Sequence, residues 1–444
     1  MSENLPRTLV PRVPERNLGR FRENEGHEKL NSWEVFETPS HSLEVLKEAA
    51  EYLKTKDVPV AFPTETVYGL GADATRSAAV KGIYAAKGRP SDNPLIIHIS
   101  DLEMLRSLLT PEKSTSNGTA NGGHDPIPEI YKPLIDKFWP GPLTILLPNP
   151  TPSRLAPEVT AGLKTFGVRM PNSPLALSLI KLTGAPLAAP SANASTKPSP
   201  TTAGHVLEDL YGRIDLILDG GPCLVGVEST VVDGLCDPPV ILRPGGVSID
   251  ELRCCAGWEK VEKGYKDHSE TGKSTPRAPG MKYKHYSPKA KVILYEAAFE
   301  KGRDGIQIDD IEDLVRDREA QQIPVSKGGP LRVGIIRTRH WKPAAGLRCS
   351  NLKRWVREES QEADELYVQE GEFHDTTSGA TVGKLLDVSI GEDTRSIAQG
   401  LFSALRELDK RDADIIFVEG IVDDEDIGAA VMNRLRKAAS RIRS

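Results

Sequence analysis

The sequence predicts an α/β protein with two domains joined by a polar linker. Strand-like apolar runs alternate with helical stripes along most of its 444 residues, a pattern typical of sheets covered by helices. The length suffices for two or three domains. The composition shifts over residues 258–280, where Gly, Lys and Ser gather, and the apolar pattern then resumes. We therefore expect a larger first domain and a smaller, parallel α/β domain.

Composition narrows the classes of function. The net charge is −6, so a main role in nucleic-acid binding is disfavoured and any RNA contact needs a local basic patch. The five cysteines form no C-x-x-C pair, which favours reduced thiols in an intracellular protein. No apolar run is long enough to span a bilayer. Residues 1–25 lack the apolar segment of a secretory signal and contain too many acids for a transit peptide, so we expect a cytoplasmic protein.

The first domain follows a polar arm. Residues 1–38 show no sustained periodicity and are expected to be disordered. Ser42 can cap a helix whose apolar stripe runs over residues 43–53. A short strand over residues 58–62 then enters a turn over residues 64–66, Thr-Glu-Thr. Hydroxyl groups there can hold a compact polar ligand, or they can simply cap the turn.

Two cations at a helix-to-strand junction give the strongest local signal. Lys87 and Arg89 follow an apolar-periodic run that Gly88 and Pro90 end, and an apolar strand follows at residues 95–99. An ammonium and a guanidinium at such a junction suit an oligophosphate. The common alternative is a solvated pair on a surface turn.

Two further arginines repeat this pattern in the first domain. Arg169 stands in an apolar strand, which is costly unless an anion of a ligand or an internal carboxylate pairs with it. Arg243 closes another apolar strand. Residues 186–202 form a small-residue strand and a Ser/Asn/Pro-rich loop whose N–H groups can hold phosphate oxygens. Residues 111–126 are low-complexity and predict a disordered surface insertion. The other elements of this domain are expected at residues 101–108, 128–138, 143–147, 174–182, 214–218 and 226–233.

The second domain is predicted from the alternation that follows the linker. Strands are expected at residues 291–295, 331–336, 365–369 and 414–419, and helices at 379–388, 394–409 and 427–440. The run over residues 379–385 looks like a phosphate loop, but it is one residue short and has Leu385 where Ser or Thr should hold magnesium. The Lys-Tyr-Lys-His-Tyr cluster over residues 282–286 is unusual for a linker and could fold over a pocket as a lid.

Several motifs together carry a family resemblance. They are Pro63-Thr-Glu-Thr-Val-Tyr-Gly-Leu-Gly71, Lys87-Gly-Arg89, Pro190-Ser-Ala-Asn193, Gly226-Val-Glu-Ser-Thr230, Leu242-Arg-Pro-Gly245 and Ala278-Pro-Gly-Met-Lys-Tyr-Lys-His-Tyr286. In this order they resemble the threonylcarbamoyl-AMP synthases in their two-domain form. The resemblance implies a YrdC-like twisted mixed sheet with flanking helices over residues 39–257. It also implies a linker or lid over 258–289 and a smaller Rossmann-like parallel α/β domain over 290–444.

An enzyme activity follows from the resemblance. Such nucleotidyltransferases condense L-threonine, bicarbonate and ATP into threonylcarbamoyl-AMP and pyrophosphate. ATP is expected with Mg²⁺ held mainly by its phosphates, because the sequence has no evident carboxylate cluster for a metal. The product is expected to pass to the tRNA threonylcarbamoyl-transfer machinery, which modifies the adenosine beside the anticodon. A weak contact with double-stranded RNA and no membrane association complete these expectations.

The resemblance also assigns residues, position by position. The threonine pocket corresponds to Thr66, His98, Arg169, Ala189 and Ser229. The ATP contacts correspond to Arg89, Asn93, Thr165, Ser191, Ser199, Arg243 and Tyr283. Lys87 and Arg89 are the expected catalytic residues, acting through positioning and neutralisation of phosphate charge without a covalent intermediate. His98 could act as a general base, but we favour a role as a hydrogen-bonding residue of the pocket, because no partner acid is visible.

Three rival functions remain open at this point. A nucleic-acid-binding module would bind RNA in a salt-sensitive way without ATP turnover. A hydrogenase-maturation carbamoyltransferase shares the YrdC-like domain, but it would need zinc-finger cysteine pairs and an acylphosphatase domain, and the sequence has neither. A non-catalytic threonine or nucleotide sensor would release no pyrophosphate when mixed with ATP, threonine and bicarbonate.

Overall fold

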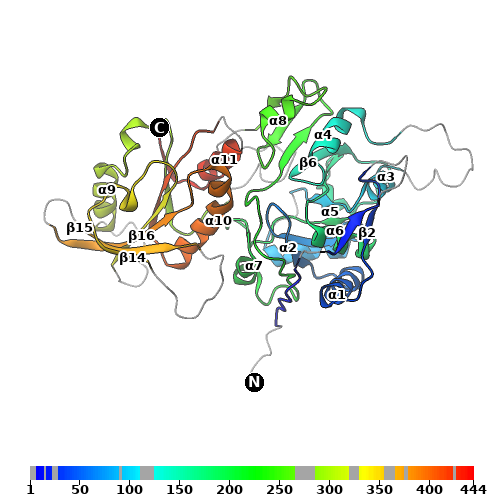
Figure 1. Cartoon of the computed structure of the whole chain (residues 1–444), viewed down its shortest axis with the longest axis horizontal. Helices are drawn as coiled ribbons and strands as arrows, with labels where there is room; N and C mark the ends of the chain where they lie inside the picture. Colours follow the sequence, from blue (N-terminus) through cyan, green and yellow to red (C-terminus); the bar gives the residue numbers. More distant parts are fainter. Residues whose placement is uncertain are drawn as a thin grey trace, which may run out of the picture. The chain divides into compact units, whose positions relative to one another are not determined.

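The computed structural model describes residues 7–14, 17–22, 29–89, 93–110, 125–265, 286–319, 330–354, 366–374, 379–423 and 427–444. These form two compact units, Met1–Ser195 with Ser199–Tyr283 and Thr196–Pro198 with Lys284–Ser444 (Figure 1). Tyr283, most of the expected lid and nearly all of the 111–126 insertion lie outside the described residues. No helix in the described ranges has both the length and the hydrophobicity needed to cross a bilayer.

A nine-stranded mixed sheet forms the centre of the first unit. Its strand order is β11-β10-β9-β6-β7-β5-β8-β4-β3. The strands are β3 (Val60–Phe62), β4 (Gly69–Asp73), β5 (Ile96–His98), β6 (Leu143–Pro148), β7 (Thr165–Arg169), β8 (Leu187–Ala188), β9 (Thr230–Asp233), β10 (Val240–Arg243) and β11 (Glu262–Lys263). Strand β7 runs parallel to β5 and antiparallel to β6. The expected mixed sheet with flanking helices is confirmed.

Several helices of the first unit begin at a residue whose side chain caps them. The helices are α1 (His41–Thr55), α2 (Ser77–Lys87), α3 (Leu102–Leu109), η2 (Glu129–Tyr131), α4 (Lys132–Phe138), α5 (Pro157–Thr160), α6 (Pro174–Thr183), α7 (Ala203–Leu210) and α8 (Ile249–Arg253). Among those with such a cap are α1, α3, α6, α7 and α8. Helix α2 ends at Gly88, whose φ of 62° is left-handed and favours glycine. The cap of α1 is Ser40 and not the expected Ser42, because Ser40 has the extended backbone and accepts from Leu43 N.

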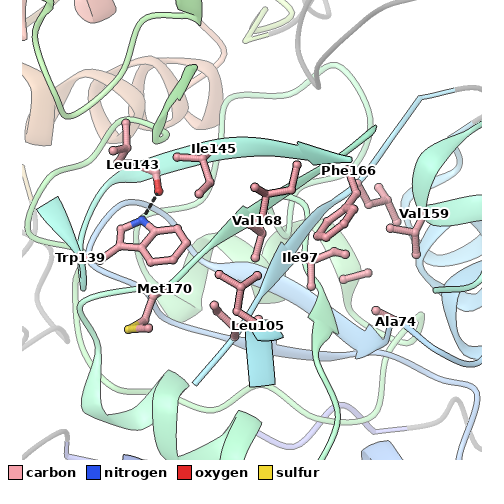
Figure 2. Close-up of a cluster of buried hydrophobic side chains, with 14 of the residues drawn as sticks. Ala74, Ile97, Leu105, Trp139, Leu143, Ile145, Val159, Phe166, Val168 and Met170 are labelled. Atoms are coloured by element: carbon pink, nitrogen blue, oxygen red, sulfur yellow. Dashed lines mark hydrogen bonds between the residues drawn. The ribbon is translucent and has the colours of Figure 1, made fainter. Parts of the chain in front are cut away.

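A buried apolar cluster holds the central strands in place (Figure 2). Ile97 of β5, Val168 of β7 and Ile145 of β6 all belong to it. Trp139 packs beside them, and its indole Nε1 donates to the backbone oxygen of Leu143 at 2.8 Å. This cluster fixes the strands whose ends carry polar residues, so those residues have defined positions.

The N-terminal arm is ordered where the structure describes it, and the expectation of disorder over residues 1–38 is wrong there. Strands β1 (Gly19–Phe21) and β2 (Trp33–Val35) pair antiparallel. Val13 is completely buried, and the Trp33 indole donates to Ser178 Oγ on α6 at 3.1 Å. Each of these apolar residues is buried singly and not as part of an apolar stripe, so the sequence shows no periodic pattern here.

The first part of the arm pairs with a segment from the middle of the chain. Leu9 N donates to Asp215 O at 2.8 Å, and Val13 N donates to Asp219 O at 2.7 Å. The same segment reaches β3 on its other side, through Leu218 N to Ala61 O at 2.8 Å. The expected strand over residues 214–218 therefore forms isolated bridges between the arm and β3.

The second unit contains a seven-stranded sheet of order β14-β15-β16-β13-β17-β12-β18. Its strands are β12 (Lys291–Tyr295), β13 (Leu331–Arg337), β14 (Cys349–Arg354), β15 (Val368–His374), β16 (Thr381–Ser389), β17 (Ile415–Glu419) and β18 (Arg441–Arg443). Its helices are η3 (Glu300–Gly302), α9 (Ile308–Glu319), η5 (Pro343–Gly346), α10 (Thr394–Lys410) and α11 (Gly428–Ala438). Helices α10 and α11 lie on one side of the sheet and α9 on the other (Figure 1).

Strands β16, β13, β17, β12 and β18 are parallel, which confirms the expected parallel α/β domain. Strands β14 and β15 extend it antiparallel at one edge. The expected helix over residues 379–388 is wrong, because this segment is β16. It pairs with β13 on one side and β15 on the other, and its Thr and Val residues favour a strand.

Candidate active site

Arg169 ends β7 and is buried, with 4% of its side chain exposed. Its Nη2 donates to Glu65 Oε2 at 2.7 Å and its Nη1 donates to Thr66 Oγ1 at 2.9 Å. Of the two partners that the sequence left open for this cation, the structure contains the internal carboxylate. Within the described residues, Glu65 Oε1 and Arg169 Nε have no hydrogen-bond partner. The pair is balanced in charge, but it retains one acceptor and one donor for a ligand.

The turn that carries Glu65 and Thr66 is held by its own hydroxyl groups. Thr64 Oγ1 and Thr66 Oγ1 share a hydrogen bond of 2.9 Å, and Thr64 Oγ1 also donates to Val67 O at 2.7 Å. Backbone bonds from Val225 N to Glu65 O at 2.7 Å and from the next residue's N to Thr66 O fasten the turn to the segment that leads to β9. The Thr-Glu-Thr turn is therefore held by its own hydroxyl groups and by the segment before β9.

His98 ends β5 directly beside Arg169, its partner in the register of the two parallel strands. Burial, and secondarily the Arg169 cation, lower the pKa of His98 well below its ordinary 6.5. The imidazole is therefore neutral at physiological pH. Its Nδ1 finds no hydrogen-bond partner in the described part of the chain. Such a ring can accept from, or donate to, a small ligand without adding charge.

Ser229 lies just before β9 and joins two other site residues. Arg243, at the end of β10, donates to Ser229 O from Nε at 3.1 Å and from Nη2 at 3.0 Å, and Nη2 also reaches Ser229 Oγ at 3.1 Å. Thr144 Oγ1 of β6 lies 2.7 Å from the same Ser229 Oγ. Gly245 packs so tightly here that a Cβ would lie 2.1 Å from Thr230 N. Only glycine fits this crossing of backbones.

Lys87 holds the loop after β8. Its Nζ donates to the backbone oxygens of Ser191 and Asn193, the latter at 2.7 Å, and lies 3.4 Å from Asn193 Oδ1. Ser191 Oγ donates to Asn193 Oδ1 at 2.5 Å, and Ser195 N donates back to Lys87 O at 3.1 Å. In this structure the buried ammonium therefore organises the loop that carries Ser191.

Five further predicted residues lie within the described ranges. Asn93 is fully buried, Tyr84 Oη donates to its backbone oxygen at 2.8 Å, and its side-chain amide has no hydrogen-bond partner among the described residues. Ser199 Oγ donates to Glu228 Oε1 at 2.6 Å, and Ala189 N donates to Ile96 O at 3.0 Å. Arg89 follows the end of α2, and Thr165 begins β7, at the opposite end of that strand from Arg169.

The sheet order explains why residues far apart in sequence meet. Strands β9, β6, β7 and β5 are neighbours in the sheet. Ser229 precedes β9, Thr144 is near the start of β6, and Arg169 and His98 end β7 and β5. Because β6 and β9 run opposite to β7, all four residues lie at the same edge of the sheet. This edge gathers a guanidinium, a carboxylate, a neutral imidazole and several hydroxyl groups.

Two family models together cover most of the chain. Residues 53–245 match a model described as "Telomere recombination", and residues 247–440 match "Threonylcarbamoyl-AMP synthase, C-terminal domain". The threonylcarbamoyl-AMP synthase of Schizosaccharomyces pombe is 47% identical over 414 residues, 90% of each chain. The Bacillus subtilis enzyme of the same name is 42% identical over 394 residues, 89% of this chain and 92% of its own.

The chain belongs to the threonylcarbamoyl-AMP synthase family. A crystal structure of Pyrococcus abyssi Sua5 complexed with L-threonine is similar over 98% of this chain and 99% of its own, with a TM-score of 0.68 and 37% identity. The resemblance drawn from the motifs, and the two-domain architecture that it implied, are thereby confirmed.

Four buried or half-buried residues of this family member were missing from the residues assigned by sequence. They are Glu65, Thr144, Asn193 and Glu228, and each bonds directly to an assigned residue. Glu65, Asn193 and Glu228 stand inside the motifs that carry the family resemblance, so their position next to assigned residues could have pointed to them. Thr144 stands in an apolar strand, and only the register of β6 against β7 reveals its position.

Proposed function

We propose that this chain synthesises L-threonylcarbamoyladenylate from L-threonine, bicarbonate and ATP, with release of pyrophosphate. The observation that carries the proposal is the buried Arg169, which lies at one sheet edge with Thr66 and His98. A guanidinium next to hydroxyl groups and a neutral imidazole suits a small hydroxylated amino acid, because the guanidinium can bind its carboxylate by two parallel hydrogen bonds. Members of the family to which the chain belongs carry this activity in their names.

The threonine site in this proposal comprises Thr66, His98, Arg169, Ala189 and Ser229. Arg169 binds the carboxylate, while Thr66, His98 and Ser229 bond the other polar groups of threonine. Ala189 leaves room beside the β5 strand. The neutral state of His98 fits this role, since the ring can then donate or accept a hydrogen bond without adding charge to the site.

The ATP site in this proposal comprises Arg89, Asn93, Thr165, Ser191, Ser199, Arg243 and Tyr283. Lys87 and Arg89 neutralise phosphate charge, and Lys87 also shapes the Ser191 loop that it already holds. Mg²⁺ arrives on ATP and is held mainly by its phosphates.

The reaction proceeds in two steps. The threonine amine forms a carbamate with bicarbonate, and a carbamate oxygen then attacks the α-phosphate while pyrophosphate leaves. Catalysis rests on positioning and charge neutralisation. The product passes to the tRNA threonylcarbamoyl-transfer machinery in the cytoplasm, for modification of the adenosine beside the anticodon. A weak contact with double-stranded RNA accompanies this role.

Pyrophosphate release tests the proposal directly. The purified full-length chain is mixed with Mg²⁺-ATP, L-threonine and bicarbonate, and omission of any one substrate should stop release. The substitution Arg89→Ala should abolish release, because a phosphate-neutralising cation is lost. Arg253→Ala is the matched control, since Arg253 is half-exposed and pairs only locally with Asp250. Wild-type rates in R89A, or turnover without threonine, would overturn the proposal.

A further inference from the structure

We propose that Glu65 binds the ammonium group of the substrate amino acid through Oε1 and takes its proton before the carbamate forms. This rests on the proposed function, because it gives a role to a residue inside the same site. The carboxylate shares the Arg169 guanidinium with the predicted threonine pocket, and it is 6% exposed. Its charge therefore acts on the bound ligand without much screening by solvent.

The hydrogen bonds of Glu65 leave one oxygen for the ligand. Oε2 is occupied by Arg169 Nη2 at 2.7 Å, whereas Oε1 is buried and has no partner among the described residues. A buried carboxylate oxygen without a donor is costly, and native proteins normally satisfy such atoms. A ligand that brings a donor to this point removes the cost. An ammonium does so best, because the acceptor is anionic.

Charge balance points to the same group. In the empty site the Glu65 anion already neutralises Arg169, so a ligand with only a carboxylate would be repelled by Glu65 as it approaches Arg169. A zwitterion avoids this conflict, since its carboxylate contacts the guanidinium and its ammonium contacts Oε1. The Glu65–Arg169 pair therefore presents opposite charges that match the two charged groups of an α-amino acid.

The chemistry requires an acceptor at this place. An ammonium has no lone pair, so it cannot attack carbon until one proton leaves. In the proposed step that proton passes to Glu65 Oε1, and the nitrogen lone pair forms the N–C bond to bicarbonate. One C–O bond breaks, and its hydroxyl leaves as water with a second proton from nitrogen. The products are the carbamate anion, water and protonated Glu65, so atoms and charge balance. His98 is a poor alternative acceptor, because burial holds it neutral by lowering its proton affinity.

A binding cycle separates this role from a purely supporting one. Affinities of wild type and Glu65→Gln are measured by calorimetry for L-threonine, for (R)-3-hydroxybutyrate, which lacks the ammonium, and for L-threoninol, which lacks the carboxylate. Wild type should bind (R)-3-hydroxybutyrate about tenfold or more weakly than L-threonine, because it loses a charge-assisted hydrogen bond to the ammonium. In E65Q the affinities for these two ligands should differ little. Asp387→Asn, in a buried Arg337 pair of the second unit, is the control and should behave as wild type.

Two outcomes of the cycle overturn the assignment. An unchanged ammonium penalty in E65Q shows that Glu65 does not contact that group. Equal losses of affinity for threonine and (R)-3-hydroxybutyrate, with threoninol unaffected, show that Glu65 only orients Arg169. If wild type itself fails to bind threonine, the proposed function fails first, and this result is distinct from the other two.

The pH dependence tests the proton transfer. At saturating threonine, E65Q should lose about 100-fold or more in kcat at neutral pH, the usual effect of removing a general base. Its rate should rise about tenfold per pH unit below the amine pKa, since only free amine reacts, while wild type stays flat. Parallel pH profiles would overturn the proton-transfer role. If E65Q does not fold, the pH dependence of threonine binding to wild type tests the assignment. The affinity should fall above the amine pKa, because threonine then loses its ammonium charge. A rise in affinity there would overturn the assignment.

Discussion

Lys87 Nζ donates to the backbone oxygen of Asn193 at 2.7 Å and so joins the end of α2 to a loop 106 residues later. The same ammonium bonds Ser191 O, so a single cation sets the shape of the loop that we assign to ATP. A buried lysine used in this way is both a structural and a binding element. This dual role makes its removal measurable in two independent ways.

Lys87→Met should destabilise the protein and weaken ATP binding together. The change leaves buried carbonyl oxygens without a donor, which costs about 1 to 3 kcal/mol. Urea unfolding measures this loss, and titration with ATP measures the second effect. Lys81→Met is the control on the same helix, since Lys81 is 66% exposed and should change stability by less than about 0.5 kcal/mol. A stable K87M with normal ATP affinity would contradict the role of the loop contact.

Asn93→Ala should weaken ATP binding without harming the empty protein. The Asn93 amide is fully buried and its side chain has no hydrogen-bond partner within the described residues, so its loss removes no hydrogen bond to any of them. If ATP supplies the missing partners, affinity should fall about tenfold. Asn31→Ala is the control, because that amide accepts from Arg106 Nη1 at 2.8 Å, in a contact between the arm and α3 that includes no assigned residue. Large destabilisation of N93A with unchanged ATP affinity would mean a structural role instead.

Arg243→Lys should lower the affinities for ATP and threonine together. Arg243 reaches both Ser229 O and Ser229 Oγ, so it joins a residue assigned to threonine to the ATP site. Lysine is a point charge and cannot reproduce these forked contacts. We expect about tenfold weaker binding of each substrate by calorimetry.

Thr144→Val provides the comparison for Arg243→Lys. It removes only the hydroxyl that lies 2.7 Å from Ser229 Oγ, so threonine affinity should fall while ATP affinity stays constant. If R243K lowered the affinity for ATP but left the affinity for threonine unchanged, Ser229 would not couple the two sites.

The stability of the protein should fall as the pH drops below about 6.5, in part because of His98. Its pKa is lowered in the folded state, so below the ordinary value of 6.5 the unfolded chain binds a proton that the folded chain does not. This difference costs up to about 1.4 kcal/mol per pH unit. Urea unfolding of His98→Asn between pH 5 and pH 7.5 should show a weaker dependence than wild type. The exposed His41→Asn should leave the dependence as it was; equal slopes in H98N and wild type would contradict the assignment.

The local structure around several assigned residues could be predicted, because the motifs that carry them are local. Gly88 ends α2 beside Lys87 as expected, and Asp101 caps α3 by accepting from Met104 N. The mixed sheet and the parallel second sheet follow from the order of apolar runs. What the sequence could not supply is the partner of each polar group. Arg169 was equally compatible with a ligand anion or a carboxylate, and only the fold brings Glu65 to it across 104 residues.

The errors have physical causes as well. The expected helix over residues 379–388 gave too little weight to Thr381, Val382 and Val388, which favour a strand, and the segment pairs with both β13 and β15. The arm was expected to be disordered because Val13 and Trp33 are isolated apolar residues in a polar sequence. Their burial depends on α6 and on residues 214–219, which no local pattern reports.

The pairing of Leu9 and Val13 with residues 215–219 also bears on solubility. The arm covers one side of that segment, which is bonded to β3 on the other. A chain that lacks its first 14 residues would present an uncovered row of N–H and C=O groups, the kind of open edge that recruits a second molecule. Truncated or tagged forms of this protein that disturb the arm should therefore self-associate through backbone pairing even while the pocket residues remain intact.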